Sequence, residues 1–242
     1  MVKISLINFE LFLLIFSILA MQHGYHYKRI VAPHIPGYHS TWVKVVHLYR
    51  MLHEYDIVVF LDADVYVRNP KTSLEFLMKR YNFTDTSSLL MASDPNLNHN
   101  KDSKGRVTLN MGFIIVRSNN LTKHIFRELA SCGDTISGCD NWKLNWSHEQ
   151  RAFSEYFRDR FKVGSELIIG PCTEINGYDT STTDCKGDFV LHVWAAKQTI
   201  PERLKKLMVN NLMSILEEKM WSDNHIFIAP TSDIQKLDEE KN

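Results

Sequence analysis

The sequence lacks an excess of charge of either sign. Its 28 lysine and arginine residues balance 28 aspartate and glutamate residues, so the formal net charge is +0 at pH 7. Affinity for nucleic acid depends largely on neutralising the phosphate backbone with basic side chains. Nucleic acid is therefore not an expected partner. Internal repeats and low-complexity blocks are also lacking, and 242 residues that are 44% hydrophobic are typical of one globular domain.

Cysteine is scarce, and its pattern is informative. No Cys-x-x-Cys is present, so a structural zinc site is not expected. The four cysteines fall in two local pairs, Cys132/Cys139 and Cys172/Cys185, which suits two short disulfide loops. Three connectivities are possible, and four free thiols in a cytosolic protein are the alternative. The disulfide interpretation favours a lumenal compartment, and three glycosylation sequons agree with it: Asn82, Asn120 and Asn145.

The first 21 residues allow more than one interpretation. Lys3 precedes an apolar run over residues 11–21, but Glu10 interrupts any longer span, and a membrane-spanning helix needs about 20 apolar residues. The segment is a signal peptide, a weak signal anchor or a buried first helix. We therefore expect three parts: the hydrophobic segment 1–21, a main domain over 22–230 and a polar tail over 231–242.

Short buried apolar runs alternate with amphipathic stretches along the main domain. Strands are expected over residues 57–61, 89–92, 113–116 and 189–193. Helices are expected after Ser40 or Thr41, after Ser73, over residues 148–157 and from Pro201 onward. This alternation predicts an α/β fold with a mostly parallel sheet flanked by helices. Ligands of such sheets bind at the carboxyl ends of the strands.

Asp62 and Asp64 stand at one such strand end, directly after the apolar run 57–61. Two carboxylates held this close repel each other unless a cation lies between them. Mg²⁺ and Mn²⁺ prefer oxygen ligands and are often held by one or two carboxylates together with substrate phosphates. The alternative is a strand-end aspartate that caps a turn while its neighbour faces solvent.

Five further motifs keep one order around the string 55–70, YDIVVFLDADVYVRNP. They are His-Gly-Tyr-His-Tyr at 23–27, Trp42-x-Lys44, Asn-Met-Gly at 110–112, His-Glu-Gln at 148–150 and Leu-His-Val-Trp at 191–194. Together they resemble the GT-A-fold, nucleotide-sugar-dependent glycosyltransferases. The resemblance is closest to the retaining fungal galactosyl- and mannosyltransferases and the related plant xylosyltransferases, and it covers roughly residues 21–197.

The resemblance implies a Rossmann-like GT-A sheet and a set of site residues. Asp62, Asp64 and His192 would hold the metal, and the imidazole favours Mn²⁺ over Mg²⁺. Lys44 and Lys197 would neutralise phosphate, and Asn110 and Gly112 would line the donor-sugar pocket. The residues facing the anomeric carbon would be Glu149, Gln150 and Asp94. The donor would be a nucleoside diphosphate sugar and the acceptor a glycan or glycoprotein, with retention of configuration. The location would be the Golgi or endoplasmic reticulum lumen, with type II membrane anchoring through residues 1–21 as one option.

The start of the chain departs from the family pattern. Residues 1–21 contain no clear strand and loop to hold the nucleoside. One expectation is therefore a sheet without its first nucleotide-binding strand. Either the chain is truncated or a different start has replaced that element. A catalytically inactive lumenal binding protein is therefore one alternative. A haloacid-dehalogenase-type phosphatase, which also uses Asp-x-Asp after a strand, is the other. Trp142 and Trp146 either stack on an acceptor sugar or belong to the core.

Overall fold

The computed structural model describes residues 3–6, 19–178 and 183–194, and runs of one to three residues between 196 and 214. The chain divides into two units, Met1–Ile200 and Pro201–Asn242, and each is considered by itself. In the second unit residues 201–203 are helical, as the proline in the first turn predicts. The fold and the site described below belong to the first unit.

A six-stranded mixed sheet forms its centre, in the order β2-β1-β3-β6-β5-β7. The strands are β1 (Lys3–Leu6), β2 (His26–Arg29), β3 (Ile57–Leu61), β5 (Leu89–Ser93), β6 (Leu109–Arg117) and β7 (Leu167–Gly170). Three of the five neighbouring pairs are parallel, and β6 is antiparallel to both of its neighbours. The predicted α/β fold with a mixed, mostly parallel sheet is confirmed.

A strand from the start of the sequence, β1, belongs to the sheet, which argues against the possibility that the first strand is lacking. β1 lies between β2 and β3 and is parallel to both, with Ile4 opposite Tyr27 on one side and Val59 on the other. The strand is only four residues long and stands four residues before a much longer apolar run, so it carries little sequence pattern of its own. The expected domain boundaries at residues 21 and 230 stay predictions.

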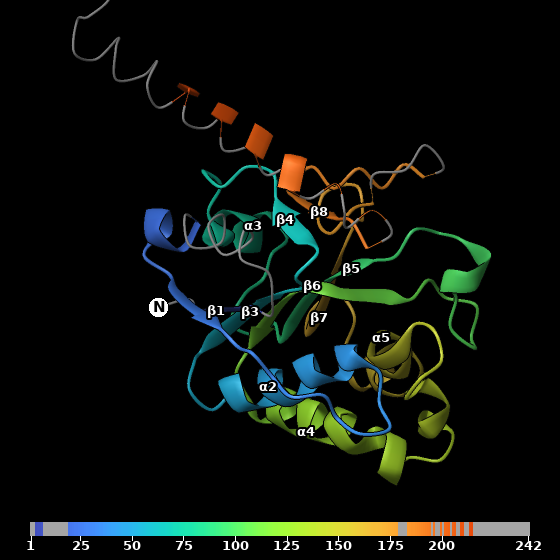
Figure 1. Ribbon diagram of the computed structural model, residues 1–242. Coiled ribbons are helices and arrows are strands. Elements are labelled where there is room, and N and C mark those ends of the chain that lie inside the picture. Colours follow the sequence, from blue (N-terminus) through green and yellow to red (C-terminus); the bar gives the residue numbers. More distant parts are fainter. Residues whose placement is uncertain are drawn as a thin grey trace, which may run out of the picture. The chain divides into compact units, whose positions relative to one another are not determined.

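Helices pack on the sheet because both present apolar faces. The helices are α2 (Val43–Met51), α3 (Leu74–Arg80), α4 (Asn120–Thr135) and α5 (His148–Ala152). Figure 1 shows α2 and α4 side by side below the sheet and α3 above it. Alternate residues of the strands, such as Val58 and Phe60 of β3, face Leu48 of α2 and Phe126 of α4 in one buried core.

One of the two predicted capping residues is confirmed. Ser73 accepts a hydrogen bond from the Phe76 backbone N–H and begins α3, as expected. The earlier helix starts instead with a 3₁₀ turn, η1 (Ser40–Trp42), and the cap is the His39 side chain, which accepts from the Thr41 N–H. Histidine is an uncommon cap, so the sequence pointed to the neighbouring hydroxyl residues.

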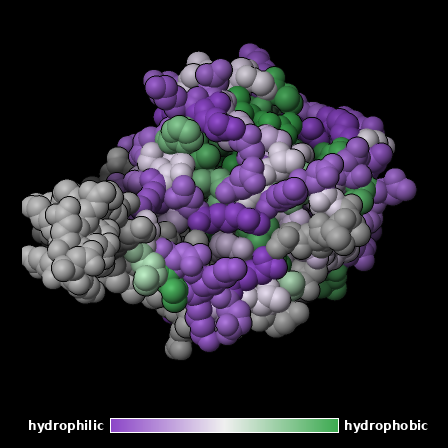
Figure 2. Space-filling model, turned by 90° about the horizontal axis from the view of Figure 1, so that it is seen from above, coloured by the Kyte–Doolittle hydropathy of each residue, from purple (hydrophilic) through white to green (hydrophobic). Residues whose placement is uncertain are grey.

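Both local cysteine pairs form disulfide bonds, Cys132–Cys139 and Cys172–Cys185, which confirms the expected pairing. The second bond closes a loop that leads into β8 (Val190–His192), the partner of β4 (Val65–Val67) in a separate two-stranded sheet. Figure 2 shows the face of the molecule seen from above, where hydrophilic side chains predominate among the coloured residues. Within the described residues, no helix has the length and apolar character that a membrane span requires. Residues 7–18 of the N-terminal apolar segment lie outside the described residues.

Candidate functional site

Two backbone connections bring the aspartate pair to His192. β3 ends at Leu61, and the next N–H, of Asp62, donates to the Gly112 carbonyl at 2.8 Å. The chain then turns into β4, whose Val65 lies opposite His192 of the antiparallel strand β8. The Val193 N–H donates to the Asp64 carbonyl at 2.9 Å. Residues 128 positions apart thus lie side by side because β4 and β8 pair.

The side chains of Asp62, Asp64 and His192 offer ligand atoms that all lie within 4.8 Å of one another. The Nε2 atom of His192 is 3.0 Å from Asp64 Oδ1 and 3.9 Å from Asp62 Oδ2. Two ligands about 2.1 Å from one hard cation lie roughly 3 Å apart at right angles and about 4.2 Å apart when opposite. The two imidazole–carboxylate distances lie in this range, and ligand atoms up to 4.8 Å apart would have to close by about 0.6 Å to share one divalent cation such as Mn²⁺, which the oxygen–nitrogen donor set suits. Whether these residues bind a metal stays a prediction.

Gly112 makes room for the imidazole of His192. A Cβ on Gly112 would stand 2.5 Å from His192 Nδ1 and would also overlap Cε1 of the same ring. The sequence predicted that Gly112 lines the donor-sugar pocket. In the structure its near neighbour is the imidazole of His192, which packs against the backbone of β6.

Lys44 forms ion pairs with Asp62, one of the aspartate pair, and with Glu149. Its Nζ lies 2.7 Å from Asp62 Oδ2 and 3.0 Å from Glu149 Oε1, and both Lys44 and Glu149 are buried. Burial alone would lower the pKa of Lys44, but the two carboxylates more than offset this, and the pKa is held above its ordinary value. Lys44 is therefore not a surface lysine, and its charge is already matched by Asp62 and Glu149. The other oxygen of Glu149, Oε2, is buried with no hydrogen-bond partner among the described residues.

A second polar network is centred on the buried carboxylate of Asp94. Its Oδ1 accepts from Asn110 Nδ2 at 2.8 Å, and its Oδ2 accepts from Thr108 Oγ1 and from Gln150 Nε2, each at 2.7 Å. Burial raises the pKa of Asp94, and the hydrogen bonds from Asn110 and Thr108 partly offset this. The neighbours Glu149 and Gln150 therefore serve different networks: Glu149 contacts Lys44 and Gln150 contacts Asp94.

Asn176 is a site residue that the sequence analysis missed. Its Nδ2 donates to Oδ1 of Asn110, an oxygen that also accepts from the Gly112 N–H at 2.8 Å. Its own Oδ1 is buried without a hydrogen-bond partner among the described residues. The only signal in the sequence is an Asn-Gly pair, which ordinarily marks a turn. Thr108, at the entrance to β6, was missed as well and carries no pattern of its own.

The structure thus brings nine of the ten predicted residues into one region, because each belongs to the triad or to a network that touches it. The tenth, Lys197, lies outside the described residues. The two tryptophans separate: Trp142 packs against the core and under Arg151, whereas Trp146 is 58% exposed.

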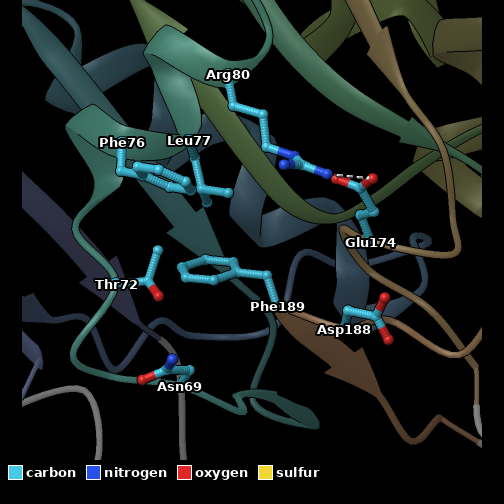
Figure 3. Close-up of a pocket in the computed structure, with 8 residues that line it drawn as sticks. All are labelled: Asn69, Thr72, Phe76, Leu77, Arg80, Glu174, Asp188 and Phe189. Atoms are coloured by element: carbon cyan, nitrogen blue, oxygen red, sulfur yellow. Dashed lines mark hydrogen bonds and ion pairs between the residues drawn. The ribbon is translucent and has the colours of Figure 1, made fainter.

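A separate hollow of about 180 Å³ contains none of the predicted residues. Figure 3 shows its lining, where the rings of Phe76 and Phe189 face each other and Arg80 pairs with Glu174. Glu174 also accepts from the Tyr81 hydroxyl, and together these partners lower its pKa to about 2. A carboxylate held this way is a structural ion pair and is poorly suited to proton transfer near neutral pH.

Residues 33–181 match the nucleotide-diphospho-sugar transferase family. The chain belongs to this family. No curated protein sequence matches it.

Solved structures agree on the fold. A glycosyltransferase involved in the glycosylation of the major capsid of PBCV-1 is similar over 86% of this chain and 98% of its own, with a TM-score of 0.61 and 14% identity. The galactosyltransferase LgtC, in complex with donor and acceptor sugar analogues, is similar over 84% of this chain and 95% of its own, with a TM-score of 0.55 and 12% identity. The fold is therefore that of the GT-A glycosyltransferases, and the family identifies the protein as a nucleotide-sugar glycosyltransferase.

Proposed function

We propose that this glycosyltransferase uses Mn²⁺ to transfer a hexosyl or pentosyl group from a nucleoside diphosphate sugar to a glycan hydroxyl, with retention of configuration. The observation that carries the proposal is the convergence of Asp62, Asp64 and His192 next to two buried polar networks. Retention, and a place near the fungal galactosyl- and mannosyltransferases and plant xylosyltransferases, rest on the sequence resemblance.

Asp62, Asp64 and His192 would hold the cation, which supplies Lewis-acid stabilisation of the charge on the leaving diphosphate. Lys44 keeps the Asp62 carboxylate oriented through its 2.7 Å contact. The same ammonium group forms an ion pair with Glu149. Because both of its contacts are with carboxylates, Lys44 acts here by positioning Asp62 and Glu149.

In the transfer, the acceptor oxygen bonds to C1 of the sugar, the C1–O bond to the diphosphate breaks and the proton of the acceptor hydroxyl is released. Positive charge that develops on the sugar ring would be stabilised by the Glu149 carboxylate, whose Oε2 has no protein partner among the described residues. Asp94, Asn110 and Gln150 would hold the donor sugar, because their hydrogen-bonded network fixes each group in one orientation. We assign no nucleophile.

The test is release of nucleoside diphosphate from a panel of sugar nucleotides in the presence of Mn²⁺. Turnover by the wild type and its loss in Asp64→Ala are expected. Asp85→Ala is the matched control, because Asp85 is a fully exposed aspartate outside the site. Equal turnover in wild type and Asp64→Ala would refute the metal assignment.

The same panel distinguishes the alternatives. Tight binding of a sugar nucleotide without turnover would favour a catalytically inactive binding protein. Phosphate release from simple phosphomonoesters would point to a phosphatase.

We further propose a lumenal location in the Golgi or endoplasmic reticulum, with membrane anchoring through residues 1–21. Two disulfide bonds support an oxidising compartment. The sequon residues Asn82, Asn120 and Asn145 are all exposed and open to glycosylation. Intact-mass measurement of protein made in a eukaryotic secretory host, before and after deglycosylation, tests this. An unmodified mass with free thiols would contradict it.

A further inference from the structure

An aromatic cluster is formed by Trp146, Tyr178 and Trp194. The Tyr178 and Trp194 rings are stacked, with centroids 4.4 Å apart and an interplanar angle of 19°. Trp146 packs against Trp194, with ring centroids 5.7 Å apart and an interplanar angle of 54°. Trp146 in turn lies 6.3 Å from His148, whose ring is stacked on His39 at 3.6 Å.

Each ring of the cluster is carried by a segment that also supplies a residue to the polar site. Trp194 follows His192 by two positions, and Tyr178 follows Asn176 by two positions. Trp146 precedes Glu149 by three. Because two residues of extended chain span at most about 7 Å, the backbones of Trp194 and Tyr178 lie within that distance of His192 and Asn176. The segments of Tyr178 and Trp194 also run together, since the His192 N–H donates to the Gly177 carbonyl at 2.8 Å.

The exposure of Trp146 is not explained by packing. Tryptophan is usually largely buried, and an exposed one next to a polar site is typical of a recognition surface. By contrast Trp142, four residues earlier, packs against the core. The cluster offers apolar ring faces, Trp146 being 58% exposed, on segments that also carry hydrogen-bonding groups of the polar site. A pyranose ring has the same two characters: a face of C–H groups and an edge of hydroxyls. Binding sites for small ligands combine aromatic walls with a few fixed polar groups in this way.

We infer that Trp146, Trp194 and Tyr178 form the acceptor site, which binds the ring of a glycoside through its C–H face and directs a hydroxyl toward the polar site. This inference rests on the proposed function. It deepens it by naming the three aromatic residues that hold the acceptor ring.

Saturation-transfer NMR on the full chain tests the inference without any donor. The probes are the methyl glycosides of galactose, xylose and mannose. Transfer to the ring C–H protons of at least one probe is expected. The signal should fall at least about fivefold in Trp146→Ala and be largely retained in Trp146→Phe, which keeps an aromatic wall. Phe76→Ala is the matched control, because Phe76 is a similarly exposed aromatic residue, at 54%, that lines the separate hollow.

Where transfer activity is measurable, a second readout is the acceptor KM. We expect it to rise about tenfold in Trp146→Ala with a smaller change in kcat, so that the ratio of transfer to donor hydrolysis falls. Saturation transfer from no glycoside, or equal transfer in wild type and Trp146→Ala, would overturn the inference. Glycoside binding that depends on Trp146 in a protein without nucleotide turnover would support the aromatic site and refute the proposed function.

Discussion

Gly112→Ala is the sharpest perturbation of the site, because it adds one methyl group between β6 and the imidazole of His192. The new Cβ would stand 2.5 Å from His192 Nδ1, whereas ordinary van der Waals contact begins at 3.4 Å. The ring must therefore move by about 1 Å. Metal–ligand distances tolerate errors of only about 0.2 Å.

The magnitude follows from that comparison. An imidazole shift of about 1 Å is several times the tolerance of a metal–ligand distance, so His192 should bind the metal much more weakly. We expect the affinity for Mn²⁺ to fall about 10- to 100-fold. Forcing a methyl group into a packed site should also cost about 1–3 kcal/mol of stability. Isothermal titration calorimetry with Mn²⁺ measures the first effect, and urea unfolding of the metal-free protein measures the second.

A double-mutant cycle separates the clash from other effects of the substitution. In Gly112→Ala/His192→Ala the imidazole is gone and only the milder contact with Asn110 Oδ1 at 3.0 Å remains, so most of the cost of the glycine substitution in metal-free unfolding should disappear. Mn²⁺ affinity should stay low, because the ligand is lost. Wild-type Mn²⁺ affinity in Gly112→Ala, or additive unfolding energies in the cycle, would refute the proposed role of Gly112.

Three further outcomes are expected. Lys44→Met should lower the free energy of unfolding by about 3–5 kcal/mol, because it leaves the buried Glu149 carboxylate unpaired, and adding Glu149→Gln should restore part of it in urea titrations. Glu174→Gln should flatten the acid branch of a stability–pH curve. The pKa of Glu174 is lowered from 4.5 to about 2 by its hydrogen bonds, so its contribution is present above pH 4.5 and is lost as the pH falls toward 2. Solvent screening limits that contribution to about 1 kcal/mol. Cys172→Ser/Cys185→Ser should cost roughly 3 kcal/mol, as expected for a loop of this length.

The sequence predicted the parts of the fold whose patterns are local. The run at residues 57–61 is apolar at every position because β3 is buried on both faces, and Ser73 caps α3 with its own hydroxyl. β1 escaped because four residues carry too little pattern beside a longer apolar run. The His39 cap escaped because it depends on a side-chain geometry that the residue type does not indicate.

For the site, too, the sequence predicted what depends on local patterns and missed what depends on the tertiary arrangement. Asp62 and Asp64 could be found from one strand and its end, and the other predicted residues from the order of the motifs. The contacts among them could not be found in this way. That Gln150 reaches Asp94 while Glu149 reaches Lys44 depends on where α5 meets β6 and α2. Asn176 enters the site only because the Asn-Gly segment lies beside β8.

One loop supports both halves of the site. The Cys172–Cys185 bond closes it, and Gly177 approaches Gly187 so closely that a Cβ on Gly177 would overlap the backbone of Gly187. The same loop carries Asn176, which donates to Asn110, and Tyr178, which stacks on Trp194. Loss of the bond should therefore weaken Mn²⁺ binding and glycoside binding together. Cys132→Ser/Cys139→Ser provides the matched control, because that bond joins α4 to η3 (Cys139–Trp142), elements that supply no residue to the triad or the aromatic cluster. If both disulfide variants lowered stability but left both affinities unchanged, the loop would be a structural staple only.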